Sequence, residues 1–115
     1  MPEPGPAARL VILMDEGRTW NHKPLVNEII ARAHRAKLAG ASAFRGVEGF
    51  GASQMVHTSR ILDLSDKLPM MVLIVDSHDK IEGFLPELVE LPIGGVITID
   101  DVTVVGPGAG EADTR

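Results

Sequence analysis

"PMMVLIVDSHDKIEGFLPELV", residues 69–89, decides the fold because it joins an uninterrupted apolar run to a helical pattern. The run at residues 70–75 is typical of a strand that other elements cover. Ser77 is a suitable N-cap for a helix that begins just after this strand. Apolar residues then recur at helical spacing, namely Ile81, Phe84, Leu85, Leu88 and Val89. Pro86 falls inside this pattern, so we expect it to kink or break the helix.

The N-terminal half of the chain shows the same order of elements. Residues 10–14, "LVILM", form a first apolar strand, and Pro24 suits the first turn of a helix. The apolar stripe of that helix consists of Leu25, Ile29, Ala33 and Ala36. Gly40 is a plausible C-terminal stop, and a second strand follows at residues 43–47.

The last strand closes a second strand–helix–strand unit. Ile97 and Ile99 share one face of it, and the pattern then slips by one residue at residues 100–101, which predicts a β-bulge. Two such units predict an α+β fold, the ferredoxin-like βαβ-βαβ sandwich, with a four-stranded antiparallel sheet and two helices on one face. The other face of so apolar a sheet would be exposed, so we expect a homo-oligomer whose sheets pack together.

Length and composition suit a single small domain. We expect a flexible lead-in at residues 1–7, a folded domain at 8–105 and a disordered tail at 106–115. The net charge is -5 and lysine and arginine form no block, which argues against nucleic-acid binding. The absence of cysteine excludes disulfides and thiolate chemistry. No apolar stretch approaches the length of a membrane helix, and no signal peptide is apparent, so we expect a cytoplasmic protein without membrane insertion.

The stretch "RGVEGFGASQMVHTSR", residues 45–60, ends the second strand in a run of glycines. These glycines could form a backbone cradle for a ligand, or a bulged strand end that makes room for packing. Arg45 could hold a phosphate in a cleft between subunits, or it could be a solvent-facing or ion-paired residue. Arg60 has the same two interpretations.

Several motifs resemble one family. "AGASAFRGVEGFGAS", "HTSRILDLSDKLP", "VDSHDKIEGFLP" and "GGVITIDDV" occur in the order and spacing of the uncharacterised PII-like family known as domain of unknown function 190. More distantly, the chain is similar to the nitrogen-regulatory PII proteins. These are trimers of ferredoxin-like subunits that bind adenine nucleotides between subunits. A mobile loop between their second and third strands engages a partner protein.

The resemblance implies a set of site residues. The ligand-binding cleft would contain Arg45, Glu48, Gly49, Phe50, Gly51, Gly94 and Gly95. The partner loop would carry Ser53, His57, Thr58 and Arg60. PII proteins hold phosphates with a lysine before the last strand, whereas this chain has "LPIGGVITIDDV". The resemblance therefore implies a homotrimer that binds AMP, ADP or a cyclic nucleotide rather than ATP, and acts on a membrane transporter, a channel or an enzyme.

Two other functions remain open at this level. His57 and nearby carboxylates could bind a divalent metal, as in the cation-tolerance proteins of similar fold, although no metal-ligand spacing supports this. The chain could also be an oligomeric adaptor that binds no ligand. Trp20 could stack on a base or cover the entrance to the first helix. No nucleophile–base pair is recognisable, so we expect no enzymatic activity.

Overall fold

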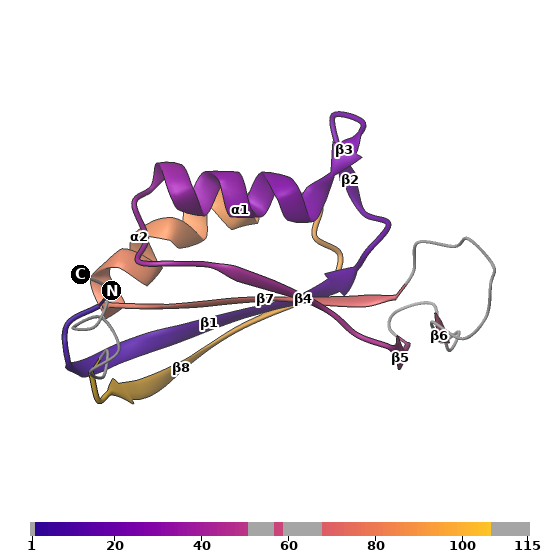
Figure 1. Cartoon of the computed structure of the whole chain (residues 1–115). Coiled ribbons are helices and arrows are strands. Elements are labelled where there is room, and N and C mark those ends of the chain that lie inside the picture. The colour runs from indigo at the N-terminus through magenta and orange to yellow at the C-terminus, as the bar shows by residue number, and fades with distance from the viewer. Residues whose placement is uncertain (1, 51–56, 59–67, 107–115) are drawn as a thin grey trace, which may run out of the picture.

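The computed structural model describes residues 2–50, 57–58 and 68–106. Its main sheet has four antiparallel strands in the order β4 (Ser42–Arg45), β7 (Pro69–Asp76), β1 (Gly5–Asp15) and β8 (Val96–Val104). Two helices, α1 (Leu25–Arg35) and α2 (His78–Val89), lie side by side on one face of the sheet (Figure 1). This confirms the predicted ferredoxin-like fold. Neither helix, nor any other in the described part, is long and apolar enough to span a membrane.

The core lies between the two helices and the sheet. In β1 and β7 every second side chain is buried against the helices, which is the alternation expected of a sheet covered on one face. The largest fully buried side chains are Leu10, Ile12, Leu25, Ile29, Val72, Ile74, Ile81, Phe84 and Leu88. Aliphatic side chains supply nearly all of this core, as the scarcity of aromatic residues requires.

Two small hairpins are additions to the βαβ-βαβ plan. Strands β2 (Thr19–Trp20) and β3 (Lys23–Pro24) pair just before α1, and their turn residues Asn21 and His22 have φ values of 50° and 68°. Two successive positive φ angles are typical of the tight turns that join antiparallel strands. Strands β5 (Glu48–Gly49) and β6 (His57–Thr58) form the second hairpin, beyond the end of the sheet (Figure 1).

The first strand and the first helix differ in their limits from the prediction. Strand β1 begins at Gly5, so three residues of the predicted lead-in belong to the sheet, where Ala7 is buried. Helix α1 ends before Gly40, because Lys37 takes the left-handed position with φ 63°. Backbone bonds of 3.0 Å from Lys37 N to His34 O and 3.2 Å from Leu38 N to Ala33 O close this end as a Schellman motif.

The predicted bulge was wrong, and the predicted break of the second helix at Pro86 does not occur. Strand β8 has no bulge, because its pairing with β1 runs one-to-one from Gly5↔Val104 to Leu13↔Val96. The alternation of apolar residues along β8 shifts by one position because β8 is an edge strand with no single buried face. Ile97 and Ile99 are both 40% exposed. Helix α2 also continues through Pro86 to Val89. A proline removes one backbone hydrogen bond, and the burial of Leu88 in the core holds the last turn.

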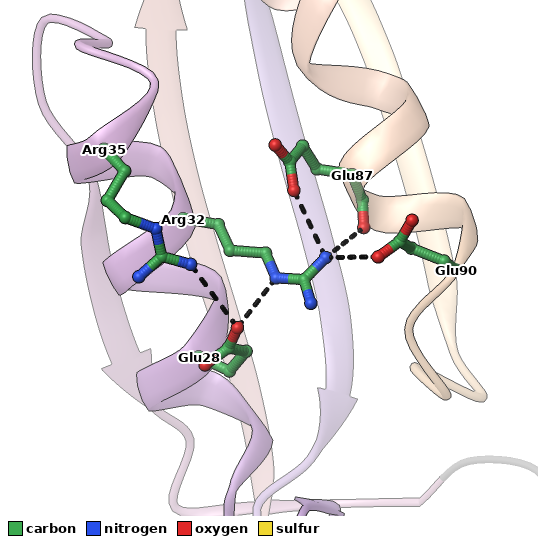
Figure 2. Close-up of polar contacts among 5 residues, drawn as sticks. All are labelled: Glu28, Arg32, Arg35, Glu87 and Glu90. Atoms are coloured by element: carbon green, nitrogen blue, oxygen red, sulfur yellow. Dashed lines mark hydrogen bonds and ion pairs between the residues drawn. The ribbon is translucent and has the colours of Figure 1, made fainter.

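Arg32 joins the two helices (Figure 2). Its Nε lies 2.8 Å from Glu28 on α1, and its Nη1 lies 3.2 Å from the carboxylate of Glu87 and 2.8 Å from that of Glu90. The hydrogen bond to Glu28 is the main reason that the pKa of Arg32 is raised, and it likewise lowers the pKa of Glu28. The guanidinium also lies 5.5 Å from the ring centroid of Trp20.

Trp20 therefore covers the entrance to α1, since its ring packs against the core and under the Arg32 guanidinium. Arg32 is not part of the apolar stripe of α1, so spacing along the chain gives no reason to expect its burial. The structure instead gives its side chain an exposed fraction of only 10%, because α2 brings two carboxylates to it.

The second face of the sheet, which we call the open face, is covered by neither α1 nor α2 (Figure 1). The strand register places Leu13 beside Val96 and Phe44 beside Met71 on this face. Leu13, Phe44 and Val96 are 44%, 48% and 53% exposed. Farther along, Arg9 and Asp100 face each other across β1 and β8 with Nη2 and Oδ2 2.6 Å apart, and this pairing lowers the pKa of Asp100.

Candidate functional site

The described candidate residues lie at one end of the sheet, where β1 and β4 end and β7 and β8 begin. Arg45, Glu48, Gly49 and Phe50 lie on the β4 side of this end. Gly94 and Gly95 lie on the β8 side, directly before that strand. Figure 1 shows β5 and β6 projecting beyond this same end.

Arg45 is the last residue of β4 and is paired with Met70 across the sheet. Its Nη2 forms an ion pair with Oε2 of Glu16, which directly follows β1. Glu16 is itself tied to the start of β7, because its N–H donates to the Leu68 carbonyl at 2.9 Å. Arg45 is thus both ion-paired and exposed, with a side-chain exposed fraction of 62%.

The glycines after Arg45 allow a close approach to Pro69. The N–H of Gly46 donates to the Pro69 carbonyl at 2.7 Å, and a Cβ on Gly46 would lie 2.7 Å from Pro69 Cγ. A Cβ on Gly49 would lie 3.0 Å from the same atom. A side chain at either position would therefore crowd the proline ring. The density of glycine here has a structural cause within one chain, whether or not a ligand also binds.

The hairpin of β5 and β6 forms the base of the β4–β7 connection. Glu48 pairs with Thr58 and Gly49 pairs with His57. Phe50 and Val47, on either side of β5, are 63% and 70% exposed, so this base presents apolar side chains to solvent. Gly51, Ser53 and Arg60 lie outside the described residues, and the structure describes only the backbone of His57 and Thr58.

Gly94 and Gly95 each have a specific packing reason to be glycine. Gly94 has a φ of +62°, and a Cβ there would overlap Nη2 and Cζ of Arg18. A Cβ on Gly95 would overlap the carbonyl oxygen of Leu13 on β1. Arg18 was not a predicted site residue. Its only sequence signal is its position in "DEGR", directly after the first strand.

The structure does not bring the two groups of candidates together within one chain. Strands β4 and β8 are the opposite edges of the sheet. Three strand spacings of about 4.8 Å separate them, roughly 14 Å in all. Arg45 and Gly94 therefore share an end of the sheet but lie at its opposite edges.

The described residues contain no group of three histidine, aspartate or glutamate residues that could hold a metal ion. His78 is engaged elsewhere, with its Nε2 2.8 Å from Oδ1 of Asp101 on β8. The side chain of His57, on which the metal hypothesis depends, lies outside this description. The described geometry thus offers groups that can bind an anion, chiefly Arg45 and Arg18.

Comparison with solved structures finds the same fold in CPII, a nitrogen regulatory PII-like protein from Thiomonas intermedia K12. The form bound to ADP, AMP and bicarbonate has a TM-score of 0.60 at 17% identity, over 93% of this chain and 95% of that chain. The apo form has a TM-score of 0.55 at 16% identity, over 91% and 98%. Identities this low establish a shared fold.

Closer relatives appear among sequences. A UPF0166 protein of Aquifex aeolicus (strain VF5) is 32% identical over 96 residues, which are 84% of this chain and 90% of the relative. A UPF0166 protein of Methanocaldococcus jannaschii is 29% identical over 96 residues, which are 83% and 88%. The family model described as "DUF190: Uncharacterized ACR" matches residues 7–104. This chain therefore belongs to the DUF190 family, whose function is uncharacterised and whose fold is PII-like.

Proposed function

We propose that this chain is a PII-like regulatory protein that binds an adenine nucleotide between the subunits of a trimer. The nucleotide would be AMP, ADP or a cyclic nucleotide. Its binding would alter the connection between β4 and β7, and that connection would act on a membrane transporter, a channel or an enzyme. The protein binds and signals in this proposal, and it catalyses no reaction.

The position of the candidate residues on opposite edges of the sheet carries this proposal. Arg45 and Glu48 lie beside β4, whereas Gly94 and Gly95 lie beside β8. If the β4 edge of one subunit meets the β8 edge of the next, one nucleotide in the cleft between them can contact both groups. This arrangement would bring together residues that lie on opposite edges of the sheet within one chain.

The open face supports the assembly. It presents a run of partly exposed apolar side chains, including Leu13, Phe44 and Val96, that neither α1 nor α2 covers. Contiguous apolar patches of this kind usually mark a site of association. Three copies packed through this face would place the edge strands of neighbouring subunits side by side.

The class of ligand follows from the fold and the charges. CPII, which shares the fold, has been solved with ADP and AMP bound. In this chain the candidate cations are single arginines, and the segment before β8 contains no lysine. Few positive charges suit one or two phosphate groups better than three.

Arg45 is the residue through which a bound ligand could affect the partner-binding connection between β4 and β7. This residue ends β4, and the β5–β6 hairpin that starts the connection lies three residues farther on. A nucleotide that contacts Arg45 or Glu48 therefore contacts the base of the connection. It can change the connection only by binding one of its arrangements more tightly than another.

Thermal unfolding with light scattering on the same sample tests the proposal. The panel would contain AMP, ADP, ATP, cyclic AMP, cyclic di-AMP and bicarbonate. A ligand at about 100 times its Kd stabilises the fold by roughly 2.7 kcal/mol, which raises the Tm measurably. We expect a trimer whose Tm rises with AMP, ADP or a cyclic nucleotide. A trimer whose Tm is unchanged by every nucleotide would contradict the proposal.

A further inference from the structure

Arg18 lies against the backbone of Gly94. A Cβ on Gly94 would overlap Nη2 and Cζ of Arg18 and would lie 2.9 Å from its Nε. Three guanidinium atoms are therefore close to one Cα, so the guanidinium packs against the peptide backbone at this glycine. Any side chain at position 94 would displace it. The missing side chain of Gly94 leaves room for a cation from a different part of the chain.

Among the described residues, Arg18 differs from the other arginines because its guanidinium has no charge partner there. Arg9 pairs with Asp100, Arg45 with Glu16, and Arg32 and Arg35 both pair with Glu28. Within residues 2–50, 57–58 and 68–106, Arg18 forms no ion pair and no side-chain hydrogen bond. Its side chain is exposed, so none of its five N–H donors is taken by another residue in this part of the chain.

Backbone donors lie beside it. Gly94 and Gly95 are exposed, and their N–H groups donate to no backbone carbonyl within the described part of the chain. Gly94 is in the left-handed conformation, with φ +62°. Residues in this conformation help to form concavities of successive N–H groups that bind anions. The turn before β8 thus offers two adjacent backbone donors next to the Arg18 guanidinium.

Within the described part of the chain, no carboxylate forms an ion pair with Arg18. Glu16, two residues before Arg18, is already paired with Arg45. The planar guanidinium can donate two parallel hydrogen bonds to one phosphate group, which makes it a better phosphate ligand than a lysine. One such group suits a monophosphate or the terminal group of a diphosphate.

We propose that Arg18, together with the N–H groups of Gly94 and Gly95, forms a phosphate-binding site at the start of β8. This inference rests on the proposed function, because the phosphate would belong to the adenine nucleotide in the cleft between subunits. Arg18 then contributes, with Arg45, to the preference for AMP and ADP over adenosine. It supplies a cation that the segment before β8 lacks.

Calorimetric titration of the full chain with AMP, ADP and adenosine tests this site. We expect Arg18→Gln to weaken AMP and ADP binding about tenfold or more, because a charge-assisted hydrogen-bond pair is lost. Adenosine binding should be unchanged, and Arg18→Lys should recover only part of the loss. Arg35→Gln removes the same charge from an exposed position on α1 and should leave binding as in the wild type. Wild-type affinity of Arg18→Gln for ADP would overturn the inference.

A second titration separates this inference from the proposed function. Inorganic pyrophosphate would be added to the 15N-labelled protein, and the amide signals of Gly94 and Gly95 would be followed. Saturable shifts of both signals in the wild type, absent in Arg18→Gln, would support the phosphate site even if no adenine nucleotide binds. If the wild type binds neither ADP nor pyrophosphate, the inference is wrong together with the proposed function.

Discussion

Arg45 and Glu16 join the end of β4 to the residue after β1 through an ion pair between Nη2 and Oε2. These two strands are not neighbours in the sheet, since β7 lies between them. The pair therefore spans the start of β7 at the end of the sheet where the β4–β7 connection begins. A phosphate group that binds Arg45 must compete with the Glu16 carboxylate or share the guanidinium with it.

Replacing Glu16 should change ligand binding more than stability. In Glu16→Gln the Arg45 guanidinium loses its carboxylate, so we expect ADP to bind several-fold more tightly at low ionic strength. Added salt should reduce this gain. Arg45→Gln should weaken ADP binding. The pair is partly exposed, so either change should alter the free energy of unfolding by less than about 1 kcal/mol. Unchanged ADP affinity in both variants, measured by calorimetry, would remove Arg45 from the site.

A charge on the open face should prevent assembly. Leu13 lies on this face and is 44% exposed in the single chain. In Leu13→Lys an ammonium group would be buried between subunits, so we expect size-exclusion light scattering to give the mass of a monomer. Val89→Lys is the matched control, because Val89 is 77% exposed on α2. If Leu13→Lys kept the mass of the wild-type oligomer, the open face would not be the interface.

Two glycines should respond to alanine in opposite ways. A Cβ on Gly95 would overlap the Leu13 carbonyl oxygen and lie 3.0 Å from the carbonyl carbon, and backbone atoms cannot move aside easily. We expect Gly95→Ala to destabilise the fold by about 1–3 kcal/mol. Gly83 lies inside α2, where a Cβ would have no atom of another element within 4 Å. Gly83→Ala should stabilise the fold by about 0.5–1 kcal/mol, because glycine is unfavourable in the interior of a helix.

Urea denaturation would measure both changes. A stable Gly95→Ala variant would show that β1 and the turn before β8 can separate at small cost. A destabilised Gly83→Ala variant would show that α2 packs closely against another element at that residue.

The sequence predicts the fold well because its signal is local and periodic. The strands β1 and β7 are recognisable as continuous apolar runs. The two helices are recognisable because apolar residues, among them Ile29 and Ile81, recur at helical spacing. Both patterns can be read from the spacing of residues along the chain alone. The role of Arg32 could not be predicted this way. Its burial depends on Glu87 and Glu90, which are more than 50 residues away and reach it only because α2 packs beside α1.

The candidate site likewise contains residues that sequence spacing predicts and one that it does not. Arg45 and its neighbours stand out because glycines cluster near them in the sequence. Arg18 does not, since its contact with Gly94 joins the turn after β1 to the turn before β8. That contact arises because β1 and β8 pair antiparallel, which brings the end of one strand beside the start of the other. The contact between Arg18 and Gly94 therefore cannot be predicted from any local sequence pattern.

We call Glu28, Arg32, Arg35, Glu87 and Glu90 the Arg32 cluster. Its contribution to thermal stability should depend far more on Arg32, at its centre, than on Arg35. Arg32→Ala would leave three carboxylates without a shared cation and would uncover Trp20. We expect it to lower the Tm by several degrees. Arg35 lies 3.6 Å from Glu28 with a mostly exposed side chain, so Arg35→Ala should have little effect. Equal Tm values for the two variants in calorimetry would contradict this account.

Glu28 should make the stability depend on acid pH. Its hydrogen bond to Arg32 lowers its pKa below the ordinary value of 4.5. A carboxylate with a lowered pKa in the folded state stabilises the protein at pH values above the ordinary pKa. This stabilisation is lost as the pH falls through the lowered value. Arg32 stays charged throughout this range, because its own pKa is raised.

Glu28→Gln should therefore be less stable than the wild type at pH 7, and the difference should shrink as the pH falls from about 5 toward 3. Urea-denaturation midpoints of both proteins across this range measure the effect. Glu82→Gln is the matched control, because Glu82 is an exposed residue of α2 that forms no ion pair among the described residues. Its difference from the wild type should be small at every pH. A Glu28→Gln difference that is the same at pH 3 as at pH 7 would mean that the charge of Glu28 does not stabilise the fold through its hydrogen bond to Arg32.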